Sequence, residues 1–95
     1  MESIPFEERV VIVREILSDG EIECLLKIYR WTKSERNAFF FQVILKRISD
    51  YKKHLRGLRQ KRFVTAVRPK DPWKITRDGI LVGGVIAELR LNDLL

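Results

Sequence analysis

The stretch ISDYKKHLRGLRQKRFV, residues 48–64, is the part of the chain around which the rest is organised. Taken as a helix that starts after Ser49, it places Tyr51, Leu55 and Leu58 on one narrow stripe, because successive helical residues are about 100° apart. Between residues 50 and 62 there are six Lys or Arg and one Asp. The pattern predicts a helix with an apolar seam facing inward and a cationic face in solvent.

The side opposite the apolar seam carries Lys53, Arg56, Gly57 and Gln60. So much outward positive charge suits a polyanionic partner, although a merely solvated charged face is the alternative. Gly57 costs about 1 kcal/mol of helix propensity in this position. Its bare backbone would let a partner come close.

The charge of the chain is unevenly distributed along the sequence. Residues 1–26 carry seven acids and two bases, residues 27–77 sixteen bases and three acids, and residues 78–95 three acids and one base. A surface that only keeps a protein in solution would interleave both signs. We therefore place the binding region in the middle of the chain and give the two ends another role.

Composition predicts one globular domain over residues 1–95, since 45% of the residues are apolar and 34% are charged. The single cysteine, Cys24, excludes an internal disulfide and is expected to be a buried thiol. Cys24 and His54 cannot form a metal site by themselves, and His54 is expected to pack at the edge of the seam. No apolar run reaches the ~20 residues of a membrane span. The acidic N-terminus does not resemble a signal peptide, so we expect a soluble, cytoplasmic protein.

The first predicted element is a helix over residues 5–17. One stripe carries Phe6, Val10, Val13 and Leu17, and a second apolar side carries Val11, Ile12 and Ile16. Ser18-Asp19-Gly20 reads as a stop signal in which Gly20 adopts the left-handed conformation. A helix that is apolar on two sides needs two partners, one of which could be a second copy of the chain.

Two further helices are expected before the basic stretch, over residues 21–33 and 38–48. The second is almost wholly apolar, and its aromatic run, residues 39–41, is interpreted as core. Two alternatives remain open for this run: it has strand propensity, and aromatic rings can also stack on nucleobases.

After the basic stretch the pattern predicts a β-hairpin, with strands over residues 63–67 and 73–76 joined by the turn 68–72. The segment after it favours a final helix through Leu95, capped by Asp78, over a tight turn into a third strand at residues 80–82. The recurrence of Leu81, Val85 and Leu89 supports the helix. Gly83-Gly84 would allow another helix to approach closely.

Two motifs resemble the winged helix-turn-helix family. The first, Ile48-Ser49-x-Tyr51-x-x-His54-Leu55-x-x-Leu58-x-x-x-x-Phe63-Val64, is similar to the recognition helix and the start of the wing. Many members carry Gly before the apolar pair, where this chain has Arg62. The second, Trp73-x-Ile75-Thr76-x-x-Gly79, is similar to the pattern that leads from the wing into the last helix. The resemblance covers about residues 21–80.

The resemblance implies a mainly α fold with a small β-hairpin, in which residues 1–20 form an N-terminal helix, 21–76 the helix-turn-helix and wing, and 77–95 a C-terminal helix. MarR-like, ArsR-like and PadR-like regulators use such added helices to dimerise, and no subfamily is favoured. The implied dimerisation residues are Phe6, Val10, Val13, Leu17, Leu81, Val85 and Leu89.

The implied partner is double-stranded DNA, bound by a dimeric, nucleoid-associated regulator with the basic helix in the major groove. The implied DNA-binding residues are Ser49, Lys52, Lys53, Arg56, Arg59, Gln60, Arg68, Lys70 and Lys74. Lys27, Arg30, Lys33 and Arg36 are expected near flanking phosphates.

Other functions remain open alternatives. A sequence-neutral DNA-coating protein fits the lysine content, and winged helices also serve as protein-interaction modules in larger assemblies. Catalysis is not expected, because the sequence has no Gly-rich phosphate loop, no metal-ligand spacing and no partner for its one His and one Cys. No cofactor, small-molecule ligand or metal is predicted.

Overall fold

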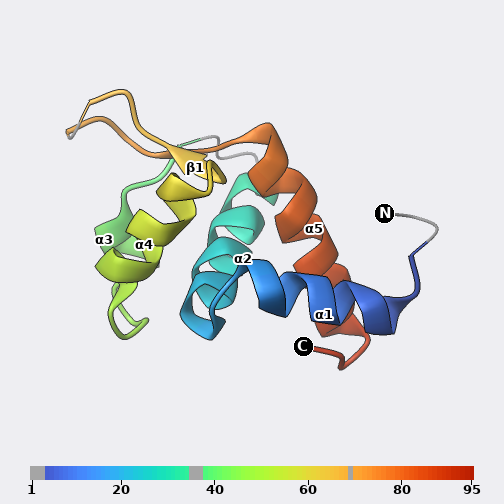
Figure 1. Cartoon of the computed structure of the whole chain (residues 1–95). Coiled ribbons are helices and arrows are strands. Elements are labelled where there is room, and N and C mark those ends of the chain that lie inside the picture. Colours follow the sequence, from blue (N-terminus) through green and yellow to red (C-terminus); the bar gives the residue numbers. More distant parts are fainter. Residues whose placement is uncertain (1–3, 35–37, 69) are drawn as a thin grey trace.

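Helix α2 (Asp19–Lys33) is the central element of the computed structural model, which describes residues 4–34, 38–68 and 70–95. Helix α5 (Arg77–Leu91) packs on one side of α2 and helix α4 (Tyr51–Gln60) on the other, while α1 (Phe6–Ile16) crosses α5 (Figure 1). The remaining elements are α3 (Phe41–Ile44), β1 (Val64–Thr65) and β2 (Lys74–Ile75). The fold is thus mainly helical with a small antiparallel sheet, as expected.

The core forms around α2 because this helix is apolar on two sides. Leu25 and Ile28 are fully buried, and the same cluster includes Leu58 of α4 and Ile86 and Leu89 of α5. Cys24 of α2 is also fully buried, as predicted. Burial first, and then the nearby carboxylates of Glu21 and Glu23, raise the pKa of the Cys24 thiol to about 12, so it stays protonated and serves as a small apolar core residue.

The junction between α1 and α2 differs from the sequence prediction. Only Leu17 and Ser18 separate the two helices, and Ser18 caps α2: Glu21 N donates to Ser18 Oγ at 3.3 Å and Ser18 N donates to Glu21 Oε1 at 2.8 Å. This reciprocal pair is a capping box. Gly20 is therefore helical and does not adopt a positive φ. Its missing side chain instead accommodates the His54 imidazole, which would overlap any Cβ at Gly20.

The predicted helix over residues 38–48 is largely replaced by turns. Phe39 lies in an isolated antiparallel bridge with Trp73, with N···O distances of 2.8 Å in both directions. Only residues 41–44 are helical. Phe39 is buried, as expected of a core aromatic residue, but Phe40 is 52% exposed, so the interpretation of the whole aromatic run as core was wrong.

The hairpin and the last helix form as predicted, but the helix ends at Leu91, where Asn92 caps it, and not at Leu95. Val64 pairs with Ile75 and Thr65 with Lys74, and the following segment is the helix α5, not a third strand. The cap is Thr76 rather than Asp78, since Thr76 Oγ1 accepts from Gly79 N at 3.0 Å and donates to Arg62 O at 2.6 Å. These two bonds connect the start of α5 to the segment that follows α4.

Glycine determines how closely α5 lies on α2. A Cβ built on Gly83 would stand 2.8 Å from Tyr29 Cβ, which is too close for real atoms. The predicted close approach of another helix at Gly83-Gly84 is thereby confirmed. α2 is the partner, and its Tyr29 ring covers this part of α5.

Candidate nucleic-acid interface

The basic stretch folds as the predicted amphipathic helix. Asp50 has a left-handed backbone (φ 57°) and α4 begins at the next residue. Leu55 and Leu58 are buried against α2, and Tyr51 is half-buried, with its ring centroid 5.7 Å from that of Phe41. The inward seam predicted from the sequence is therefore confirmed.

The opposite side of α4 is open to solvent. None of Lys52, Lys53 and Arg56 forms an ion pair with any residue that the structure describes. All six residues predicted for DNA contact in and just before this helix are exposed: Ser49, Lys52, Lys53, Arg56, Arg59 and Gln60. The structure thus brings six of the nine predicted DNA-contact residues together on α4 and the turn before it.

One part of α4 turns toward α2 instead of solvent. A Cβ on Gly57 would lie 2.1 Å from Glu21 Oε2, so the predicted outward position of Gly57 was wrong. The buried Glu21 carboxylate accepts two bonds from Lys61 Nζ, at 2.6 and 2.8 Å. The close approach that glycine permits is therefore made within the chain. Sequence reasoning missed this pair, because its members are forty residues apart.

The protonation of Glu21 depends on this contact. Burial raises the pKa of the Glu21 carboxyl, but the hydrogen bonds from Lys61 and Ser18 outweigh burial and lower the pKa below its ordinary value. Glu21 is therefore ionised at neutral pH. It neutralises Lys61, which leaves the exposed cations of α4 as the charge that a partner would meet.

The hairpin continues the positive surface away from α4. Arg68, Lys70 and Lys74 are all exposed. Arg68 Nε lies 3.5 Å from Asp71 Oδ2, but the Arg68 side chain remains 80% exposed, so this ion pair is weak. In Figure 1 the hairpin extends beyond the helices on the side of α3 and α4.

Arg59 and Trp73 connect the helix to the hairpin. The Arg59 guanidinium lies 5.5 Å from the centroid of the Trp73 ring, a cation–π contact. Trp73 is half-buried, as expected of a residue that packs the hairpin on the core, and its backbone forms the bridge with Phe39. Arg59 is thereby oriented toward the hairpin, while Lys52, Lys53 and Arg56 project without such a contact in the described structure.

Ion pairs elsewhere involve the arginines of α1 and α5. Arg9 Nη1 lies 3.5 Å from Glu88 Oε2, Arg14 Nη1 lies 3.7 Å from Asp19 Oδ1, and Arg90 pairs with Glu23. The acidic residues of the chain ends therefore balance the cations of the chain ends. In the described ranges, cations without an acidic partner lie on α4, on the hairpin, and on α2 and the turns after α3.

The seven residues predicted for dimerisation are Phe6, Val10, Val13, Leu17, Leu81, Val85 and Leu89, and the structure divides them. Val13, Leu17 and Leu89 are at most 3% exposed, because α1 and α5 pack on the core of their own chain. These three side chains have almost no exposed surface that a second copy of the chain could contact. Phe6, Val10 and Val85 are half-buried against the same core. Leu81 is 62% exposed.

Of the residues expected near flanking phosphates, Lys27, Arg30 and Lys33 are exposed on α2, and Arg36 lies outside the described residues. Lys33 Nζ lies 5.7 Å from the centroid of the Tyr29 ring. Within the described ranges, no three His, Cys, Asp or Glu side chains come close enough to hold a metal ion. Among the same residues, no helix has the length and apolar character needed to cross a bilayer.

Comparison of the chain with protein-family models, curated protein sequences and solved structures finds no match. Functional conclusions about this chain therefore depend on its own geometry and charge.

Proposed function

We propose that this protein binds double-stranded DNA, with the exposed face of α4 in the major groove and the hairpin along the backbone. The observation that carries the proposal is the cluster of Lys52, Lys53 and Arg56, which project from one helix face with no acidic partner in the described structure. Phosphate groups would supply the missing negative charge. Lys and Arg can also read guanine O6 and N7 from the major groove.

The order of elements supports a winged helix-turn-helix arrangement. Helix α2 is followed by the short α3, the basic α4 and the β1–β2 hairpin, which would be the wing. Arg62 occupies the position where many family members carry Gly, and its φ is 64°. A left-handed backbone at this point is what glycine adopts most easily. The departure from the family pattern therefore concerns the side chain and leaves the backbone shape intact.

A dimer would place two copies of α4 on two half-sites about 34 Å apart. The exposed apolar residues of α1 and α5 support this part of the proposal: Val11, Ile16, Ile80 and Leu81 are between 39% and 62% exposed. Ile12, Ile16, Leu81 and Val85 also line an apolar groove of about 160 Å³ between the two helices. α1 lies on the side of the molecule away from α3 and the hairpin (Figure 1), so this interface would leave α4 free.

The dimer is tested by Leu81→Glu, with Val67→Glu as the matched control. Val67 is 87% exposed on the hairpin side, so both variants place a charge on an exposed apolar position. We expect Leu81→Glu to halve the mass measured by light scattering and Val67→Glu to leave it unchanged. A wild-type protein that is monomeric at all concentrations would refute the dimer.

DNA binding is tested by Arg56→Gln against Arg14→Gln. Both changes remove one exposed arginine charge, but Arg14 lies on α1. Loss of a good base or phosphate contact costs about 1–3 kcal/mol, so Arg56→Gln should weaken duplex binding at least about fivefold. It should also lower the slope of log affinity against log salt by about 0.9. Equal effects of the two variants, in a gel-shift salt series, would exclude α4 as the binding element.

Footprinting then separates a regulator from a sequence-neutral coating protein. A discrete protected site indicates a regulator. Uniform protection indicates coating, which the lysines of α4 would suit because they bind phosphate as point charges and specify sequence poorly.

A further inference from the structure

A second basic surface lies between α2 and α3, in a groove of about 570 Å³. Lys27 and Arg30 come from α2, and Lys46 and Arg47 from the turns that follow α3. Sequence reasoning did not connect these two pairs. The rest of the lining consists of Trp31, Ser34, Val43 and Ile44.

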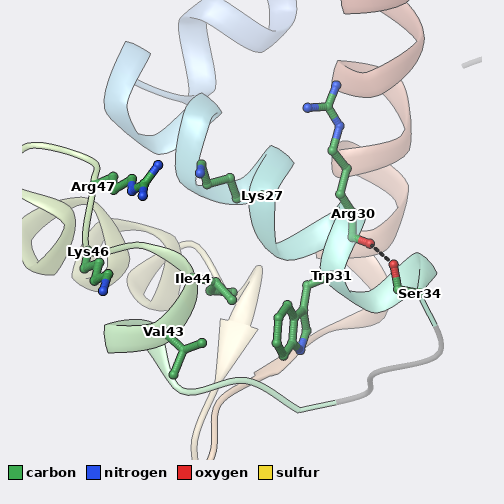
Figure 2. Close-up of a pocket in the computed structure, with 8 residues that line it drawn as sticks. All are labelled: Lys27, Arg30, Trp31, Ser34, Val43, Ile44, Lys46 and Arg47. Atoms are coloured by element: carbon green, nitrogen blue, oxygen red, sulfur yellow. Dashed lines mark hydrogen bonds between the residues drawn. The ribbon is translucent and has the colours of Figure 1, made fainter.

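The groove combines an aromatic and apolar part with a cationic part. Figure 2 shows the Trp31 ring near Ile44 and Val43, with Lys27 and Arg47 pointing toward one another from opposite walls. Trp31 Nε1 donates to Ala38 O at 2.9 Å, which fixes the plane of the ring. Val43 is 64% exposed, although it is an apolar residue. Part of this apolar surface is therefore available to a ligand.

The cations that face the groove have no acidic partner among the described residues. Like charges held across a groove repel one another, and an anion between them would remove that repulsion. Figure 2 shows Arg30 pointing away from the Trp31 ring, while Lys27 and Arg47 face one another; Lys46 also lines the groove.

We propose that this groove binds a nucleotide, with the base against Trp31 and the phosphates between Lys27, Lys46 and Arg47. A flat apolar ring and a negative group in one ligand match the two parts of the lining, and nucleotide-binding grooves combine aromatic stacking with positive charge in this way. A duplex does not fit, because its bases are stacked inside and cannot reach the ring. The nucleotide is either free or an unpaired unit of a single strand.

The site does not depend on the duplex-binding surface of α4, and paired variants keep the two apart. Lys46→Gln/Arg47→Gln removes one lysine and one arginine from the groove, and Lys52→Gln/Arg56→Gln removes the same from α4. Binding of a fluorescein-labelled, ten-nucleotide single strand and of the same sequence as a duplex is measured by anisotropy. We expect the groove variant to weaken single-strand binding at least about fivefold and duplex binding less than twofold, and the α4 variant to do the reverse.

The role of the ring is tested by Trp31→Leu against Trp31→Phe. Both variants lose the bond to Ala38, but only the phenylalanine keeps an aromatic face. We expect Trp31→Leu to bind the strand at least about fivefold more weakly than Trp31→Phe. Where Trp31→Leu fails to fold by circular dichroism, competition with the wild-type protein gives the answer, with dATP and sodium tripolyphosphate as the competitors.

Displacement of the strand by dATP at lower concentration than by tripolyphosphate supports a free nucleotide as ligand. Displacement by unlabelled strand alone supports an unpaired unit of a strand. Equal competition by dATP and tripolyphosphate would overturn the proposal, because the ring would then contribute nothing. Equal loss of single-strand binding in the two charge variants would overturn it as well. Failure of duplex binding alone would refute the proposed function and leave the groove proposal standing.

Discussion

Gly83 and Gly84 of α5 are neighbours in the chain, but alanine should have opposite effects at the two positions. A Cβ at Gly83 would lie 2.8 Å from Tyr29 Cβ and 2.9 Å from Cγ and Cδ1. These atoms are at the base of the side chain and can move only if α2 and α5 separate. A Cβ at Gly84 would meet Tyr29 Oη at 3.4 Å, and the next atoms lie at 3.7 Å, which is ordinary contact.

The magnitude follows from two opposing contributions. Alanine is more favourable than glycine in a helix by about 0.8–1.0 kcal/mol, and this gain applies at both positions. Overpacking costs about 1–3 kcal/mol, and applies only at Gly83. Gly84→Ala should therefore raise the free energy of unfolding by about 1 kcal/mol, and Gly83→Ala should lower it by about 1 kcal/mol. For a domain of this size, 1 kcal/mol moves Tm by about 4–8 °C.

The assay is thermal and urea unfolding followed by circular dichroism on the wild-type protein and both variants. We expect the two Tm values to lie on opposite sides of the wild type and at least about 8 °C apart. Two equally stabilised variants would show that Tyr29 does not limit the approach of α5 to α2. The close packing of α5 against Tyr29 of α2 would then be refuted.

Three further predictions concern single groups in the core and at helix ends. Because the pKa of Glu21 is lowered in the folded protein, its carboxylate stabilises the fold above pH about 4.5, and this contribution is lost as pH falls through the folded pKa. Glu21→Gln should therefore lower the free energy of unfolding by about 1–2 kcal/mol at pH 7. Urea unfolding should show this difference from the wild type shrinking below pH 4.5. Thr76→Ala should lower the free energy of unfolding by about 1–2 kcal/mol, and Thr76→Ser should lower it much less, because serine keeps both hydrogen bonds. Equal decreases of Tm for the two variants would disprove the cap. Cys24, with a pKa near 12, should react with a thiol reagent at pH 8 only as fast as the protein unfolds, and rapid labelling of the native protein would show that the thiol is not buried.

Long periodic segments and the hairpin could be predicted from the sequence, because one buried face dictates their pattern. The stripes that predicted α1 and α4 pack inward on the core of their own chain. The stripe of α5 packs inward at Val85 and Leu89 but leaves Leu81 62% exposed. The exposed positive charge of α4 could also be predicted. Leu55 and Leu58 are buried on one face of the helix, which places Lys52, Lys53 and Arg56 on the exposed face. A helical period fixes both faces at once.

Contacts between distant parts of the chain could not be predicted. Whether Ser18 ends one helix or caps the next depends on the reciprocal bond with Glu21, and both readings use the same residues. Phe39 leaves the expected helix because Trp73, thirty-four residues later, offers a backbone partner. The burial of Val13, Leu17 and Leu89 within one chain likewise depends on how α1 lies on α5. Tertiary context decides each of these cases, and local pattern contains no information about it.

The residues of this protein that have a left-handed backbone conformation are charged. In the described ranges, Asp50, Arg62 and Asp93 have positive φ values of 57–64°, and no glycine does. Glycines stand instead where another side chain would overlap a Cβ, as at Gly20, or where helices touch, as at Gly83. Glycine is usually expected to be fixed at positions with a left-handed backbone, and this protein should differ from that pattern. Glycine and asparagine can replace the residues at these three positions without loss of folding, while Gly20 and Gly83 inside the helices stay fixed.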